Sequence, residues 1–203
     1  DYQQSPASAK CFSGGSGGAF LWQDGVMQNL GTLGGTTGST AAAINDSGQV
    51  VGSSPISGSI DPSQPAHAFL WQNGAMQDLG TLGGRQSHAT DINNVSQVVG
   101  DSEQGNPQAP ATRAFLWQNG SMQDLGSLAG QSSRAYAINN AGQVVGESLA
   151  SLVSPFPTHA FLWQNGSMQD LGTLGGNLSF AYDISDSAQI VGYSSNAIGQ
   201  GRA

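Results

Sequence analysis

Seven residues with polar or aromatic side chains recur at the start of predicted β-strands, where together they could bind a ligand. They occupy equivalent positions in successive segments of similar sequence, and an unvarying alanine lies among them. In chain order they are His88, Asp91, Arg134, Tyr136, Phe180, Tyr182 and Asp183. A few such polar groups beside aromatic rings give ligand pockets their specificity. We expect a ligand-binding site here; the alternative is that exposed loop positions vary freely.

The same residues suggest a second hypothesis, which is catalysis. A hydrolase or lyase acting on glycans would use one of the aspartates with His88 or one of the tyrosines as acid and base. The sequence alone does not place an acid beside a base. We therefore predict a binding role and name no catalytic residues.

Two further sets of residues have a structural explanation. Histidine is a common metal ligand, but no two of the three histidines have the i, i+2 or i, i+4 spacing of a chelating pair. Three aspartates recur in the segment Met-Gln-Asp-Leu-Gly, at equivalent positions of separate units that should not converge. We predict no metal site, no cofactor, and hydrogen bonds from these aspartates to a neighbouring turn or blade. The residues are His67, His88 and His159, and Asp78, Asp124 and Asp170.

Composition restricts the partners. The net charge is -8, the isoelectric point is about 4.3, and the five basic residues are scattered. Nucleic acids and anionic membranes need clustered Lys and Arg, so neither is an expected partner. We predict no membrane span, because no apolar run approaches the roughly 20 residues that one needs. Cys11 is the single cysteine, which excludes a disulfide within this chain.

A repeated motif organises the whole chain. Phe-Leu-Trp-Gln-(Asn/Asp)-Gly occurs four times, and its tryptophans are spaced 49, 46 and 46 residues apart. Self-similarity with a period of this length is typical of repeat architectures. The four tryptophans are Trp22, Trp71, Trp117 and Trp163.

Each unit reads as four antiparallel strands. In the third complete unit they are predicted near residues 135–139, 143–146, 160–164 and 167–171. Asn165-Gly166 favours a two-residue type I′ turn, which needs positive φ at both positions. This turn sets Trp163 opposite Met168. Because both faces of the hairpin are substantially apolar, we expect neighbours on both sides and each tryptophan buried between blades, beside its methionine.

These features predict an all-β fold, specifically a four-bladed β-propeller. Residues 1–17 form an irregular N-terminal segment, and residues 18–203 form a single propeller domain of four repeats of about 46 residues. The chain opens with third and fourth strands and closes with first and second strands. N-terminal strands would therefore complete the C-terminal blade and close the ring. The alternatives are a β-solenoid or part of a larger propeller.

Two segments carry a family resemblance: His67-Ala68-Phe69-Leu70-Trp71 and His159-Ala160-Phe161-Leu162-Trp163 resemble the HAF repeat, a bacterial extracellular family named for His-Ala-Phe. Residues 77–84 and 138–146 also match, and the resemblance covers roughly residues 18–194. It implies a secreted or cell-surface protein and assigns no catalytic or binding residues. Gly18 and Arg113 replace the histidine in two repeats, so the resemblance does not imply a ring of four histidines.

We therefore expect a non-catalytic, secreted or cell-surface module that binds an extracellular glycan or a surface protein. The predicted binding surface is the loop face, which carries the long loops between second and third strands. A third hypothesis is a structural repeat for surface display or filament assembly, which would self-associate.

Overall fold

The computed structural model describes residues 17–35, 38–56, 65–105, 111–197 and 201–202, and these contain β-strands and no helix. The fold is all-β, as predicted. Residues 1–16 are outside this range. Cys11, and all of the predicted irregular segment 1–17 except Gly17, therefore lie outside the described residues. Among the described residues, no helix is long and apolar enough to cross a membrane.

The strands follow the predicted repeat. At the N-terminal end are β1 (Phe20–Gln23) and β2 (Val26–Asn29). The first complete unit contains β3 (Thr40–Ile44), β4 (Val50–Pro55), β5 (Ala66–Gln72) and β6 (Ala75–Asp78). The second contains β7 (Gly83–Ile92), β8 (Val98–Gln104), β9 (Thr112–Gln118) and β10 (Ser121–Asp124). The third contains β11 (Ser133–Ile138), β12 (Val144–Leu149), β13 (Thr158–Gln164) and β14 (Ser167–Asp170). The last strands are β15 (Gly175–Ile184), β16 (Ile190–Asn196) and β17 (Gly201–Arg202).

Within each complete unit the four strands pair in sequence order, and the hairpin register is the predicted one. In the third unit Trp163 pairs with Met168 and Gln164 pairs with Ser167. Asn165 has φ 52° and Gly166 has φ 78°, as the type I′ turn requires. The two-residue turn therefore fixes which side chains share each face of the sheet.

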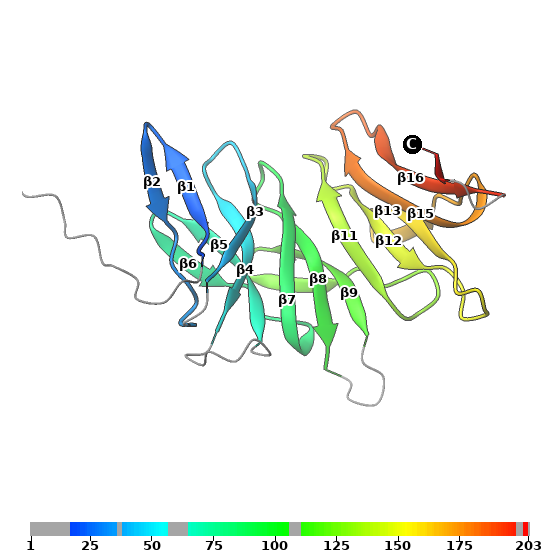
Figure 1. The fold of residues 1–203 in the computed structure, drawn as a ribbon, viewed down its shortest axis with the longest axis horizontal. Coiled ribbons are helices and arrows are strands. Elements are labelled where there is room, and N and C mark those ends of the chain that lie inside the picture. Colours follow the sequence, from blue (N-terminus) through cyan, green and yellow to red (C-terminus); the bar gives the residue numbers. More distant parts are fainter. Residues whose placement is uncertain (1–16, 36–37, 57–64, 106–110, 198–200, 203) are drawn as a thin grey trace, which may run out of the picture.

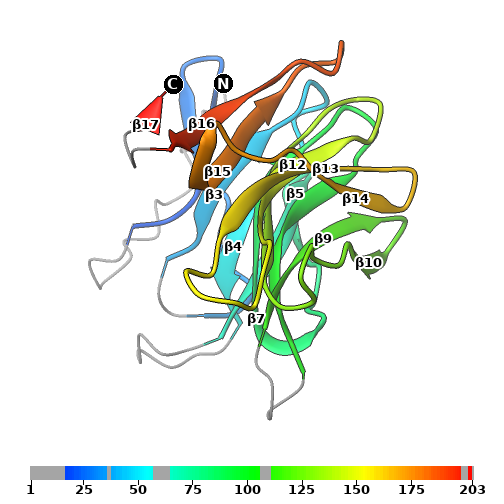
Figure 2. The ribbon, with the colours of Figure 1, turned by 90° about the vertical axis from the view of Figure 1, so that its right-hand side faces the viewer.

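The units stack through their first strands into an open, curled array. The first strands β3, β7, β11 and β15 contact one another in order, and Figure 1 shows β3, β7 and β11 side by side. The short fourth strands β10 and β14 lie on the other side of the array from β3 and β15 in Figure 2. The first strands thus line one side of the array.

Polar ladders hold neighbouring units in register. The turn asparagine of each unit donates its side-chain amide to the main-chain carbonyl of the equivalent residue in the next unit. These bonds run from Asn45 to Asn93, from Asn93 to Asn139 and from Asn139 to Ser185, each at 3.0 Å. A second contact uses a buried serine in or next to each first strand, as where Ser133 Oγ accepts from the Ala114 amide at 3.0 Å. Because these groups are buried, the bonds prevent unpaired polar atoms between blades.

The core lies between the sheets, as the two-sided apolar hairpins predicted. Trp71, Trp117 and Trp163 are 6%, 7% and 8% exposed, which confirms their predicted burial. The prediction is wrong for Trp22, which is 62% exposed. Trp22 lies on β1 at one end of the array, where no described strand packs over that face of the β1–β2 hairpin.

The closed four-bladed ring is not confirmed. Strands β1 and β2 form a two-stranded sheet of their own, and β16 pairs with β15 and β17. Figure 1 shows β1–β2 and β15–β16 at opposite ends of the array. In the part of the chain that the structure describes, the N-terminal strands therefore do not complete the C-terminal blade.

Candidate functional site

Three of the predicted site residues, His88, Arg134 and Phe180, belong to cross-strand pairs that vary together inside a fixed frame. The variable position of each first strand pairs with the residue that follows the second-strand glycine. These pairs are Thr40 with Ser53, His88 with Asp101, Arg134 with Glu147, and Phe180 with Tyr193. Directly opposed side chains interact across a sheet. The pairs thus change along the array from hydroxyl groups, through two ion pairs, to two aromatic rings.

We call the variable surface the first-strand patch. Sequence reasoning named five of its residues and missed the three on the second strands. The sequence could have indicated these three, because a single variable position follows each Val-Val-Gly or Ile-Val-Gly segment. The hairpin sets that position opposite His88, Arg134 or Phe180. The patch comprises His88, Asp101, Arg134, Tyr136, Glu147, Phe180, Tyr182 and Tyr193.

A β-bulge in the first strand directs the tyrosines of the patch. The register shifts between Ala135 and Ala137 and between Ala181 and Asp183, so Tyr136 and Tyr182 are the unpaired residues. A bulge bends its strand and re-aims the side chain. Both tyrosines consequently face the seam between neighbouring units, where their ring centroids are 6.1 Å apart.

The third unit supplies a charged group at the centre of the patch. Arg134 Nη1 lies 3.7 Å from Glu147 Oε1, and the Tyr136 hydroxyl donates to the Glu147 carboxylate. Burial, this hydrogen bond and the negative charge of Glu147 raise the pKa of Tyr136 above its ordinary value. Tyr136 therefore stays a neutral donor, while the side chain of Arg134, which is 54% exposed, remains accessible to a ligand.

Aromatic rings gather in the last unit. Phe180 and Tyr182 are nearly parallel, with an interplanar angle of 5° and centroids 6.4 Å apart. Tyr193 lies against Phe180 with centroids 5.9 Å apart. Tyr182 is 56% exposed, so the cluster presents ring surface to solvent rather than to a core.

His88 lies at the other end of the patch, where Asp101 controls its charge. Its Nδ1 is 3.7 Å from Asp101 Oδ2. The interaction with Asp101 raises the pKa of His88 above 6.5, against the opposing effects of partial burial and of Arg134. The first strands of the second and third units, β7 and β11, contact each other.

We expect a nuclear magnetic resonance titration to give His88 a pKa above that of an unstructured histidine, and Asp101→Asn to lower it. Because the folded-state pKa is raised, the interaction stabilises the fold fully below the unfolded pKa of about 6.5. That stabilisation is lost as pH rises through the folded-state pKa. An Asp101→Asn variant whose His88 titrates like the wild type would contradict the assigned pair; Asp78→Asn is the control, since its carboxylate contacts His67.

Asp91 and Asp183 were predicted to bind ligand, but their carboxylates accept hydrogen bonds from main-chain amides of the strands. Asp91 accepts from the amide of Ile92 at 2.8 Å and from that of Ile138, in the next unit, at 2.9 Å. Burial raises its pKa, and these two amides oppose the rise. Asp183 accepts from the Ile184 amide at 2.8 Å. Asp91 thus bridges two blades, and His88 contacts Asp101 instead of Asp91.

The other recurring residues have the structural role that was predicted for the aspartates. Asp78 accepts from the Gly80 amide, and Asp124 and Asp170 accept from Gly126 and Gly172, each at 2.7 Å. His67 and His159 contact Asp78 and Asp170 at 2.9 and 2.8 Å. Among the described residues, no group of three or more His, Cys, Asp or Glu side chains could hold a metal ion.

A small hollow adjoins the ion pair of the patch. It has a volume of about 240 Å³ and is lined by hydroxyl side chains together with Arg134 and Glu147. The hydroxyl groups come from two units: Thr112 from the second, and Ser132, Ser133, Ser148 and Thr158 from the third. Donors and acceptors from two units therefore surround one opening beside the pair of Arg134 and Glu147.

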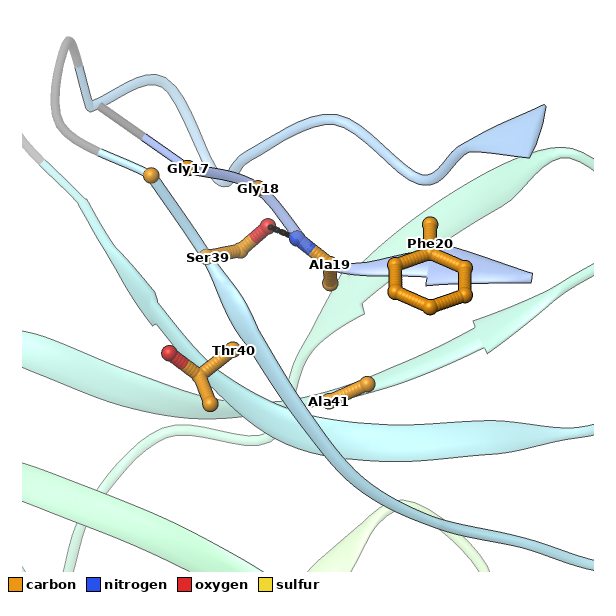
Figure 3. A pocket seen from close by; sticks show the side chains of 8 residues that line it. Gly17, Gly18, Ala19, Phe20, Ser39, Thr40 and Ala41 are labelled. Atoms are coloured by element: carbon orange, nitrogen blue, oxygen red, sulfur yellow. Dashed lines mark hydrogen bonds between the residues drawn. The ribbon is translucent and has the colours of Figure 1, made fainter. Parts of the chain in front are cut away.

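Larger hollows elsewhere offer less chemistry. One of about 640 Å³ near β1 is lined mostly by glycine and alanine. Figure 3 shows that its one drawn hydrogen bond joins the Ala19 amide to Ser39. Another of about 480 Å³ is rich in glutamine, but Gln97 is already bonded to Gln118. Neither combines charged groups with an aromatic cluster, so we take the first-strand patch as the candidate site.

Comparison with known proteins gives no relative. No protein-family model matches the chain, and neither a curated protein nor a solved structure matches it. The assignment of function consequently depends on the chemistry of the patch.

Proposed function

We propose that this chain is a non-catalytic binding module of a secreted or cell-surface protein, and that it recognises a carbohydrate or protein partner through the first-strand patch. One observation carries the proposal. Cross-strand pairs vary as units while the surrounding strands, turns and buried serines repeat, and variable residues of neighbouring units meet where Tyr136 contacts Tyr182. Variation of this kind on a rigid scaffold is typical of recognition surfaces.

The resemblance to the bacterial HAF repeat supports the extracellular location, since the family is extracellular. For the scaffold, we propose an arc of a larger propeller in preference to a closed four-bladed ring. The contacts among first strands favour blades arranged about an axis. The hairpins β1–β2 and β15–β16 lie at opposite ends of the array in Figure 1, which favours an open arrangement of these four repeats.

Binding is expected to depend on the exposed ring of Tyr182. The immobilised chain would be screened against an array of extracellular glycans and a set of purified surface proteins. Each saturable ligand should bind Tyr182→Ala about tenfold more weakly or worse, because the patch would lose its most exposed ring. Trp22→Ala is the matched control, since it removes an exposed aromatic side chain at the other end of the array.

Two results would overturn this proposal. In the first, no glycan or protein binds saturably. In the second, every bound ligand tolerates Tyr182→Ala as well as it tolerates Trp22→Ala.

A further inference from the structure

We propose that the first-strand patch binds an uncharged oligosaccharide, with one sugar ring stacked on the exposed ring of Tyr182 and a neighbouring sugar hydrogen-bonded by Arg134 and Glu147. This inference depends on the proposed function and names the ligand class for the same site.

The geometry of the aromatic cluster suits a flat, rigid ring. Phe180 and Tyr182 present nearly parallel faces, 5° apart. Tyr136 contacts Tyr182 and Tyr193 contacts Phe180, at 6.1 and 5.9 Å between centroids. Aromatic rings supply large apolar area at low conformational cost. A pyranose ring has a C–H face of similar size, so it can stack without losing the hydration of its hydroxyl groups.

The polar half of the patch can both donate to and accept from the ligand. Arg134 is a pure donor, and the ionised Glu147 is a pure acceptor. The adjacent hollow adds the hydroxyl groups of Thr112, Ser132 and Thr158, which do both, whereas Ser133 and Ser148 are buried and bond main-chain groups. Sugar hydroxyls likewise donate and accept at one atom, so a sugar can pair with Arg134, Glu147 and these three hydroxyl groups.

The charge of the patch favours an uncharged ligand over an anionic one. Its two cationic groups, Arg134 and His88, each face a carboxylate, from Glu147 and Asp101. The chain as a whole carries a net charge of -8. An anionic glycan would therefore meet no uncompensated positive charge in the patch and would approach a negative molecule.

The same ion pairs make a protein the less suitable occupant. A stable protein partner covers about 800 Å² on each side, which would extend over both ion pairs of the patch. Removing paired charges from water carries a desolvation penalty that their attraction often fails to offset. A narrow sugar chain can leave the rim of each pair in water.

The test is calorimetric titration of the full chain with uncharged hexasaccharides of β-1,4-linked glucose, xylose and mannose, and with a hexamer of galacturonate. At least one uncharged hexasaccharide should bind saturably, and the galacturonate hexamer should bind at least about tenfold more weakly. Tyr182→Phe should retain binding because it keeps the ring. Tyr182→Leu should weaken binding about tenfold or more, because it keeps apolar volume without a ring face.

Phe20→Leu is the control for a ring at the opposite end, where Phe20 lines the large glycine-rich hollow. The inference is overturned if the galacturonate hexamer binds more tightly, if Tyr182→Leu binds as the wild type does, or if Phe20→Leu alone abolishes binding. It is also overturned if no hexasaccharide binds while a surface protein binds in a Tyr182-dependent manner. That last result would leave the proposed binding function intact, whereas no binding by any glycan or protein would remove both.

Discussion

Replacing Trp117 by alanine is expected to lower the free energy of unfolding by about 3–5 kcal/mol. Its side chain is 7% exposed and belongs to a buried cluster that includes Leu70 and Leu79 of the preceding unit. The substitution removes apolar area from the contact between two blades and leaves a cavity there. Because the surrounding strands are tied by main-chain hydrogen bonds, they can collapse into that cavity only in part.

The matched control is Trp22→Ala, which changes the same residue of the same motif. Trp22 is 62% exposed, so its replacement should cost less than about 1 kcal/mol. Denaturant unfolding of both variants, followed by circular dichroism, gives the comparison. If Trp117→Ala unfolds at the wild-type midpoint, or if the two variants lose equal stability, the packing between blades is not as described.

Local chemistry explains which parts of the fold could be predicted from the sequence. Asn-Gly turns allow little choice of conformation, so they determined both the hairpin and its register. The period of the motif then indicated blades that are covered on both sides. Three of the four tryptophans are buried for this reason, and Trp22 differs only because its hairpin lies at an end of the array.

The period of the repeat does not determine whether neighbouring units close into a ring. Closure of a ring is set by the small rotation between neighbouring blades, which accumulates along the array. That rotation arises from contacts between units, such as the bond from Asn93 to the Asn139 carbonyl. No residue type or spacing specifies it. The hypothesis of a four-bladed ring was based on the count of half-blades, and the described strands do not support it.

The candidate site was predictable in part for a similar reason. Variable positions on the first strands could be read by aligning the repeats, and they identified Arg134 and Phe180. A prediction that assumes strict alternation of side chains between the two faces of a strand cannot show a bulge. The extra residue of a bulge moves every later side chain to the opposite face. The bulge at Tyr136 therefore became visible only in the paired strands.

The glycine of each Val-Val-Gly or Ile-Val-Gly segment explains how the bulge is accommodated, and it leads to the second prediction. A Cβ atom added at Gly146 would lie 1.9 Å from the carbonyl oxygen of Arg134. Gly52, Gly100 and Gly192 meet the equivalent carbonyl at the same distance. Because the obstacle is main chain, no side-chain rotation can relieve it. The first and second strands would have to separate at the residue that carries the central cation of the patch.

Gly146→Ala is therefore expected to lower the free energy of unfolding by about 1–3 kcal/mol or more, as overpacking does, and to disturb the site. The separation should break the hydrogen bond between Tyr136 and Glu147, so the raised pKa of Tyr136 should fall towards its ordinary value. Denaturant unfolding and a nuclear magnetic resonance titration of Tyr136 measure the two effects. Gly18→Ala is the control, because its Cβ would meet only the Asn29 side chain at 3.5 Å. A Gly146→Ala variant with wild-type stability and an unchanged Tyr136 pKa would show that these strands do not approach as closely as the bulge requires.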